Sequence, residues 1–321
     1  MAITGTGTQA DPFTFDPTGM TADEVWVDFK GCLAKTGYSD TSQFSYCSLP
    51  EDYILDFNDV HDTIDNIPIN INIIIGNGFT VKNLSSEWNI FRFGNRWVHS
   101  LYDVNILNAY GYSLFYAIDS TDTIKSNYFY GCVFTGVFTT PVAAFMAGNV
   151  GHRPTWYFLE SPYSRKGCGI NIECSNGAFI CGGVSSPYCR IDNSHIIFKG
   201  ETFTYNTANH AYISPDGSSE GSWTGMDYIQ SKNSLIEGEF DYLFLIGGTN
   251  GSVINVEMDS TDGKLYCAST STGNIYNSDK ATLTYAQPNA QLVGVTDAQL
   301  KDPEYLNSIG FDIGDNTGGT S

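Results

Sequence analysis

The chain has 321 residues, of which 41% are hydrophobic and 14% aromatic, so it can bury a large core and is not a disordered protein. Its formal net charge is −20 with only 15 Lys and Arg residues, which excludes a nucleic-acid partner bound through its phosphates. Only 16% of the residues are charged, and 33 Gly, 20 Tyr and 20 Phe residues favour strands and tight turns over helices.

Residues 1–40 are expected to form a lead-in and a capping helix. Residues 1–20 are rich in Gly, Thr and Pro, which suits an extended segment. Thr21 followed by Glu24 is the pattern of a capping box, which begins a helix. The helix carries an apolar stripe formed by Trp26, Phe29 and Leu33. Gly37 supplies a stop, so we expect about four turns that cover the open end of the next domain.

Residues 41–295 are expected to form a solenoid of short strands. Apolar and polar residues alternate along many segments, and Asn, which tolerates left-handed turns, recurs at their ends. A faint repeat supports this: residues 234–240 (SLIEGEF) recur as residues 252–258 (SVINVEM). One strand per repeat, stacked on the strands before and after it, predicts an all-β protein with a right-handed parallel β-helix.

The alternation breaks down twice, and we expect loop excursions from the β-helix near residues 143–165 and 208–228. Each stretch contains large aromatic residues, whose rings offer a wide contact surface with a polar edge. Our candidates for contact with a glycan or a protein partner are Trp156, Tyr157, Trp223 and Tyr228. The alternative is that these rings pack the loops onto the rod or fill a subunit interface.

Residues 296–321 are expected to form a short C-terminal helix and a polar tail. Thr296 followed by Gln299 predicts a second capping box. The apolar residues of this helix are Leu300, Tyr305 and Leu306. Residues 314–319 contain no large apolar side chain, so we do not expect them to order themselves.

The eight cysteines include no Cys-x-x-Cys pair, and several alternate with apolar residues, as Cys132 and Cys174 do. We expect free thiols in the core and folding in a reducing cytoplasm. The five His residues fall at unrelated spacings, so we expect no metal site and no cofactor.

No basic and apolar leader precedes Thr4, so we expect no Sec export. The longest apolar stretch, residues 67–75, is interrupted by Pro68 and polar residues, so we expect no membrane span. A protein of this kind that acts outside a cell would leave by another route, such as lysis.

Glu239 and Glu257 are the best catalytic candidates, because stacking of the repeat would bring them about 5 Å apart, the spacing of neighbouring strands. Two carboxylates this close can perform retaining glycoside hydrolysis. They can also bind a cation or point apart into water. A polysaccharide lyase would need a basic residue beside acidic metal ligands, and the nearest to a basic cluster is Arg153, Arg165 and Lys166.

Three parts of the sequence resemble β-helical proteins carried by tailed phages of gut bacteria. They are residues 7–13 (GTQADPF), residues 56–59 (DFND) with 75–84 (IGNGFTVKNL), and residues 296–306 (TDAQLKDPEYL) with 309–312 (IGFD). The resemblance covers the ends of the chain, and the middle only as a strand pattern. It implies a virion surface protein of the head fibre, decoration, tail fibre or tailspike type, usually trimeric.

We therefore expect a non-enzymatic structural component of a tailed-phage virion, exposed on the particle surface and made in the host bacterial cytoplasm. The expected partners are further copies of the chain in a homotrimer, other virion proteins of the capsid, fibre or tail, and a host surface glycan. The first alternative is a tailspike-like glycan-degrading enzyme that uses Glu239 and Glu257. The second is a bacterial surface adhesin, which the missing export signal disfavours.

Overall fold

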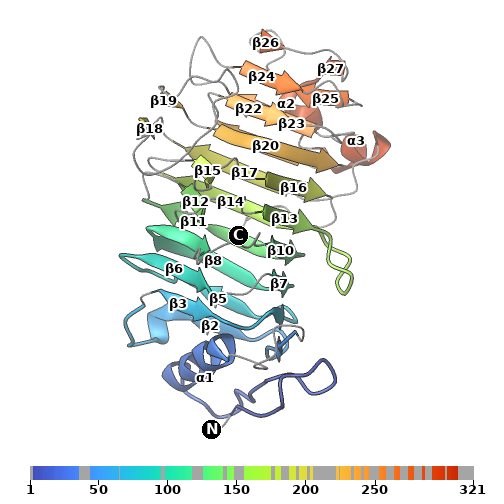
Figure 1. Cartoon of the computed structure of the whole chain (residues 1–321). Coiled ribbons are helices and arrows are strands. Elements are labelled where there is room, and N and C mark those ends of the chain that lie inside the picture. The colour runs from blue at the N-terminus through green and yellow to red at the C-terminus, as the bar shows by residue number, and fades with distance from the viewer. Residues whose placement is uncertain are drawn as a thin grey trace.

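The computed structural model is a parallel β-helix whose strands stack along one axis, from α1 at one end to β26 near the other (Figure 1). The predicted all-β parallel β-helix is therefore confirmed. The structure describes residues 3–35, 44–64, 66–94, 98–117, 126–139, 143–147 and 155–174. Beyond residue 174 it describes the strands given below, residues 291–300 and residues 302–309.

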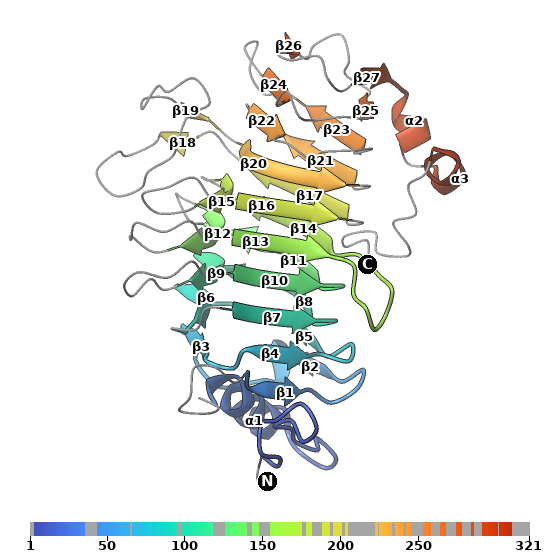
Figure 2. The ribbon, with the colours of Figure 1, turned by 45° about the vertical axis from the view of Figure 1, so that its right-hand side comes forward.

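Three parallel sheets form the faces of the β-helix (Figures 1 and 2). Sheet I consists of β1 (Tyr46–Ser48), β4 (Ile73–Ile75), β7 (Val98–Tyr102), β10 (Ser126–Tyr130), β13 (Thr155–Leu159), β16 (Tyr188–Asp192), β20 (Gly225–Lys232), β22 (Tyr242–Leu245), β24 (Lys264–Cys267) and β26 (Thr284–Tyr285). Sheet II consists of β2 (Ile54–Asp56), β5 (Thr80–Lys82), β8 (Asn105–Gly111), β11 (Val133–Phe138), β14 (Gly169–Cys174), β17 (His195–Gly200), β21 (Leu235–Glu239), β23 (Val253–Glu257), β25 (Asn274–Asn277) and β27 (Gln291–Gly294). Sheet III consists of β3 (Ile67–Ile69), β6 (Asn89–Phe93), β9 (Ser113–Ala117), β12 (Ala143–Ala147) and β15 (Ala178–Cys181).

Neighbouring strands of each sheet pair one turn of the β-helix apart. β21 pairs with β23 so that Ile236 lies beside Ile254 and Glu239 beside Glu257. This register matches the offset of the sequence repeat, which confirms that each copy is one strand of a stack.

Aromatic rings fill the interior between the sheets. The ring centroid of Phe129 lies 5.3 Å from that of Phe158 on the next strand of sheet I and 5.0 Å from that of Phe115 in sheet III. Full burial of one such side chain stabilises the fold by about 1.5–3 kcal/mol. The largest side chains with almost no exposed surface are Trp26, Trp156, Phe79, Phe91, Phe93, Phe115, Phe129, Phe134, Phe138, Phe145 and Phe158.

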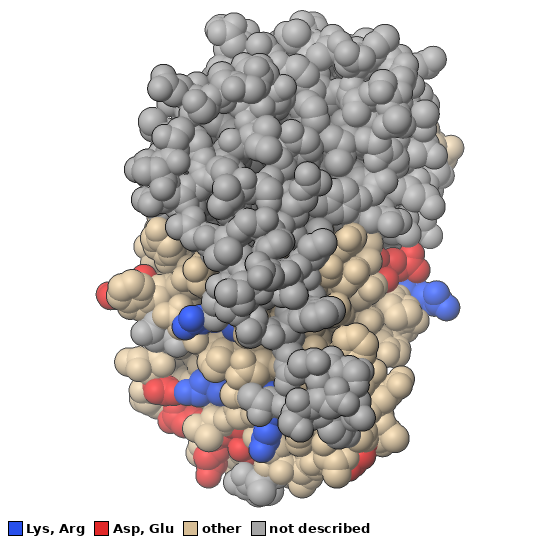
Figure 3. Space-filling model, viewed as in Figure 1, with Lys and Arg blue, Asp and Glu red and all other residues tan. Residues whose placement is uncertain are grey.

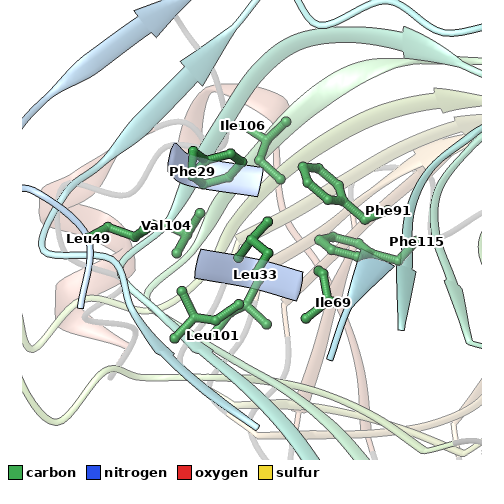
Figure 4. Close-up of a pocket in the computed structure, with 10 residues that line it drawn as sticks. Phe29, Leu33, Leu49, Ile69, Phe91, Leu101, Val104, Ile106 and Phe115 are labelled. Atoms are coloured by element: carbon green, nitrogen blue, oxygen red, sulfur yellow. The ribbon is translucent and has the colours of Figure 1, made fainter. Parts of the chain in front are cut away.

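Helix α1 (Ala22–Ala34) closes the N-terminal end of the β-helix, as expected. Its capping box is present: the Glu24 amide donates to Thr21 Oγ1 and the Thr21 amide donates to Glu24 Oε2. Figure 4 shows Phe29 and Leu33 projecting from α1 among apolar side chains of all three sheets. Only about 10 Å³ remains unfilled between them. The helix ends at Ala34, and the expected stop, Gly37, lies outside the described residues.

The lead-in pairs with the first strand of sheet I. The Phe13 amide donates to the Tyr46 carbonyl at 3.0 Å, and the Ser48 amide donates to the Phe13 carbonyl at 2.8 Å. A 3₁₀ helix, η1 (Phe57–Asp59), follows β2 and packs its Phe57 ring against Trp26 of α1.

The loop excursions expected near residues 143–165 and 208–228 are wrong in part. β12 and β13 lie within the first stretch and pair with strands on both sides. In the second stretch, β19 (Ser222–Trp223) pairs antiparallel with β18 (Phe203–Thr204), and β20 begins at Gly225. The alternation was obscured because Pro and Gly residues flank these short strands in the sequence.

Two short helices, α2 (Asp297–Leu300) and α3 (Pro303–Ser308), stand where one C-terminal helix was expected. Thr296 and Gln299 form the predicted capping box, since the Gln299 amide donates to Thr296 Oγ1 and the Thr296 amide donates to Gln299 Oε1. Pro303 separates the helices, because the residue before a proline avoids the helical conformation.

Four cysteines are described with their surroundings, and all are buried thiols outside any disulfide, as expected: Cys32, Cys47, Cys132 and Cys168. Burial raises the pKa of the Cys132 thiol well above its usual value. Among the described residues, no helix has the length and apolar character needed to cross a membrane.

Candidate functional site

A groove of about 660 Å³ lies where the chain turns from sheet I to sheet II. Its lining comes from these turns, from the first residues of the adjoining strands of sheet II, and from the loop that joins β13 to β14. We call this loop, residues 160–168, the β13–β14 loop. In Figures 1 and 2 it leaves the end of β13 and descends toward the N-terminal end of the rod.

The turns that line the groove share a left-handed backbone conformation. The φ angles are +49° at Asp52, +53° at Asn77, +52° at Asp103 and +62° at Gly131. Successive turns also bond to one another, since the Asp52 amide donates to the Asn77 carbonyl at 3.0 Å and the Asp103 amide donates to the Tyr130 carbonyl at 2.8 Å. These turns therefore recur one above another along one edge of the rod.

The carboxylate of Asp103 anchors the β13–β14 loop. Ser161 Oγ donates to Asp103 Oδ2 at 2.8 Å, and Ser164 Oγ donates to Asp103 Oδ1 at 2.6 Å. The loop is closed on itself by the Ser161 amide, which donates to the Lys166 carbonyl at 2.8 Å. Hydrogen bonds to an ionised group contribute about 1.5–3 kcal/mol, so this carboxylate holds the loop against the turns.

Tyr163 of the β13–β14 loop contributes an exposed aromatic ring to the groove. Its side chain is 61% exposed. The ring packs edge-on against Tyr102 of β7, with centroids 5.3 Å apart and planes at 70°. One edge of Tyr163 is thus held in place while the rest of the ring remains open to a ligand.

Polar side chains complete the lining. Asn105 Nδ2 donates to Thr80 Oγ1 at 3.0 Å, which fixes the amide at the start of β8. Glu51 and Asp52 are exposed on one side of the groove, and Lys166 is exposed on the loop. Carboxylate and amide oxygens accept hydrogen bonds from hydroxyl groups, while the amide and ammonium nitrogens donate them.

An exposed tyrosine ring beside hydrogen-bonding side chains suits a ligand that has many hydroxyl groups and an apolar face, as a sugar has. Asp103 is already engaged by two serine hydroxyls, so its role in the groove is to position the loop. Within the described part of the chain, no three His, Cys, Asp or Glu side chains are grouped so that they could hold a metal ion.

The structure contradicts the expectation that Trp156 contacts a ligand. Trp156 lies in β13 with no exposed surface, and its ring stacks at 6.2 Å on Phe129. Successive side chains of a strand point to opposite faces, so Trp156 points inward and Tyr157 outward. Tyr157 is half-buried and stacks on Tyr128 with centroids 4.4 Å apart.

Trp223 and Tyr228 lie in strands, and not in a loop as expected. Trp223 is paired with Phe203 in the β18–β19 ribbon, and Tyr228 lies within β20 of sheet I. Their side chains are outside the described part of the structure, so their contact with a partner stays a prediction.

Glu239 and Glu257 occupy neighbouring register positions on β21 and β23. The position before Glu239 in the same row is Lys199 of β17, and the one before that is Glu173 of β14. The side chains of Glu239 and Glu257 are not described, so catalysis by this pair stays a prediction.

Sequence reasoning missed Tyr163 and Asp103. The Ser, Pro and Tyr residues that begin the β13–β14 loop are a local signal for an exposed turn. Asp103 lies 58 residues before Ser161, and nothing in the sequence relates the two.

No family model matches the chain, and neither the curated proteins nor the solved structures that were searched contain a match. What the chain does must therefore be argued from its own residues.

Proposed function

We propose that the chain is a non-enzymatic structural component of a tailed-phage virion, exposed on the particle surface as a head fibre, capsid decoration or tail fibre. In this role it forms a homotrimer and contacts other virion proteins. The observation that carries the proposal is the continuous stack of strands, ten in each of sheets I and II, closed at one end by α1. At about 4.8 Å per strand, the stack is a rod roughly 43 Å long. The resemblance of three parts of the sequence to β-helical phage proteins supports the assignment to a virion.

Within this role, the groove beside the β13–β14 loop binds a host surface glycan. Tyr163 supplies a ring for the apolar face of a sugar, and Asn105, Asp52 and Lys166 supply hydrogen-bonding groups around it. Loops on a rigid scaffold commonly carry binding function.

The virion role is tested by mass spectrometry of gradient-purified phage particles, with this chain counted against the major capsid protein. Hundreds of copies per particle would support capsid decoration, and tens or fewer would support a fibre or tail position. Absence of the chain from purified particles would refute the virion role.

The glycan site is tested by binding of the purified protein to an array of bacterial surface polysaccharides. Tyr163→Ala should weaken binding about tenfold, the effect of losing roughly 1.4 kcal/mol. Tyr110→Ala is the matched control, because Tyr110 is also exposed, at 51%, but lies on β8 outside the groove lining. Equal affinities of both variants would exclude the groove.

The alternative is a glycan-degrading enzyme that uses Glu239 and Glu257, and the adjacent register of the two residues favours testing it. Glu239→Gln should abolish the release of reducing ends from the bound polysaccharide if this alternative holds. Binding without any release by the unmodified protein would support the non-enzymatic role.

A further inference from the structure

The outer face of the N-terminal half of sheet I carries no charged group. The five strands β1, β4, β7, β10 and β13 contain no Asp, Glu, Lys or Arg. Their inward residues are buried, and two rows of outward residues run through all five strands. We call the following half-buried outward residues the tyrosine face: Tyr46, Ile73, Ile75, Tyr102, Tyr128, Tyr130, Tyr157 and Leu159.

The rings of the tyrosine face are stacked on one another. Tyr102 and Tyr130 lie with centroids 4.4 Å apart and planes within 3°, and Tyr128 and Tyr157 lie 4.4 Å apart and within 8°. The two stacks meet where Tyr128 and Tyr130 lie 6.0 Å apart. Rings held in this way lose little conformational freedom when a partner covers them, which favours binding.

The tyrosine face is distinguished by its stacked rings together with the absence of charge from all five of its strands. Some strands of the other sheets, such as β8 and β11, also contain no charged residue, but others do. Outward positions of the other sheets carry exposed or half-buried charged residues, for example Lys82 of β5, Arg92 of β6 and Glu173 of β14. Figure 3 shows Lys, Arg, Asp and Glu side chains interspersed over the N-terminal half of the side seen in Figure 1. Protein interfaces are enriched in Tyr and depleted of Lys, Glu and Asp at their centre, which is the composition of the tyrosine face.

Charge and spacing together indicate which partner fits. Two copies of this chain each carry a net charge of −20, so their mutual repulsion is smallest where the surfaces that meet carry no charge. A second copy also repeats its rings at the same strand spacing, so the side chains of one tyrosine face can pack between those of another along the five strands of that face. A partner of another fold would not share this repeat.

We infer that the tyrosine face is the surface through which copies of this chain associate side by side with their long axes aligned. The inference rests on the proposed function, because it locates the contacts of the proposed homotrimer.

Sedimentation velocity of the purified full-length chain over a range of concentrations tests it. Wild-type protein should form a defined oligomer, and Tyr128→Glu and Tyr157→Glu should each raise the dissociation constant at least about tenfold, because each places a charge within the contact. Tyr110→Glu, the same change on an exposed tyrosine of sheet II, should assemble like the wild type. A monomeric wild type, or oligomers unaffected by the first two variants, would overturn the inference.

A second measurement needs no variant and guards against misfolding of the mutants. Hydroxyl-radical footprinting of the wild type should show that Tyr128, Tyr130 and Tyr157 become protected as concentration rises, while exposed Tyr110 and Trp88 do not. Equal protection of both groups at all concentrations would overturn the inference. The count of copies in particles is independent of either result, so failure of the interface and failure of the virion role are distinguishable.

Discussion

Ser161, a buried residue of the β13–β14 loop, donates a 2.8 Å hydrogen bond to the carboxylate of Asp103, which lies 58 residues earlier in the chain. The bond ties a loop that follows the fifth strand of sheet I to a turn that follows the third. The orientation of Tyr163, two residues after Ser161, therefore depends on a residue from an earlier turn of the β-helix.

Replacing Asp103 with Ala should loosen the β13–β14 loop. The two serine hydroxyls lose an ionised acceptor, and we expect the free energy of unfolding to fall by about 2–3 kcal/mol. Amide hydrogen exchange in residues 160–168 should rise well above that of wild type. Asp59→Ala, at an exposed aspartate of η1, is the control and should leave exchange in the loop unchanged. Unchanged exchange in Asp103→Ala would show that the serines do not hold the loop.

Gly131→Ala should destabilise the protein through two separate effects. Its φ of +62° strains any other residue, and a Cβ there would lie 2.5 Å from Asp103 Oδ1 and 2.7 Å from Ser161 Cβ. The backbone strain alone costs about 1–3 kcal/mol. Gly19→Ala separates the effects, because Gly19 has a φ of +76° but nothing within 4 Å of the added Cβ. Urea unfolding should show a larger loss for Gly131→Ala, and equal losses would mean that the loop moves aside freely.

Trp156→Ala should cost about 3–5 kcal/mol of unfolding free energy, because it leaves a cavity among Phe93, Phe129 and Phe145. Trp88→Ala, at a side chain 59% exposed, should cost little and serves as the control. Denaturant unfolding monitored by circular dichroism compares the two. Near-equal stabilities would place Trp156 on the surface, as the sequence had suggested.

Acid should weaken the contact between α1 and Asp62, whose carboxylate accepts hydrogen bonds from Lys30 and Trp26 of the helix. The hydrogen bond from Lys30 and then that from Trp26 Nε1, at 3.0 Å, hold the pKa of Asp62 below its ordinary value. A carboxyl group whose pKa is lowered by folding stabilises the protein at any pH above its pKa in the unfolded chain, about 3.9 for Asp. This stabilisation is lost as the pH falls through the pKa of the group in the folded protein. The urea midpoint should therefore drop between pH 6 and pH 3 by more in wild type than in Asp62→Asn.

The carboxylates of Asp23, Glu24 and Asp56 also have lowered pKa values, chiefly because backbone amides donate to them, so both proteins should lose some stability in acid. The difference between wild type and Asp62→Asn isolates the contribution of Asp62. An identical drop in both would show that the Lys30 contact does not stabilise α1. Asp59→Asn should behave like wild type.

The fold could be predicted from the sequence because its signals are local or periodic. Thr21 and Glu24 lie three residues apart, and the copies around Ile236 and Ile254 repeat one strand at a fixed offset. The groove could not be predicted, because Asp103 and Ser161 meet only after the turns have stacked. Trp156 was misassigned because its short strand is bordered by residues typical of loops, which hid the alternation of inward and outward side chains.

The pairing of the lead-in with β1 has a consequence for how the rod can grow. Phe13 occupies the place where another strand would add, and its amide and carbonyl satisfy groups of Tyr46 and Ser48. Unpaired strand edges are templates for end-to-end polymerisation into fibrils. This edge of sheet I is occupied and α1 closes the end of the β-helix. A strand of another molecule therefore cannot add to sheet I at the N-terminal end. A fibre longer than one rod therefore cannot arise by continuing sheet I past β1. It would need a different contact between one rod and the next.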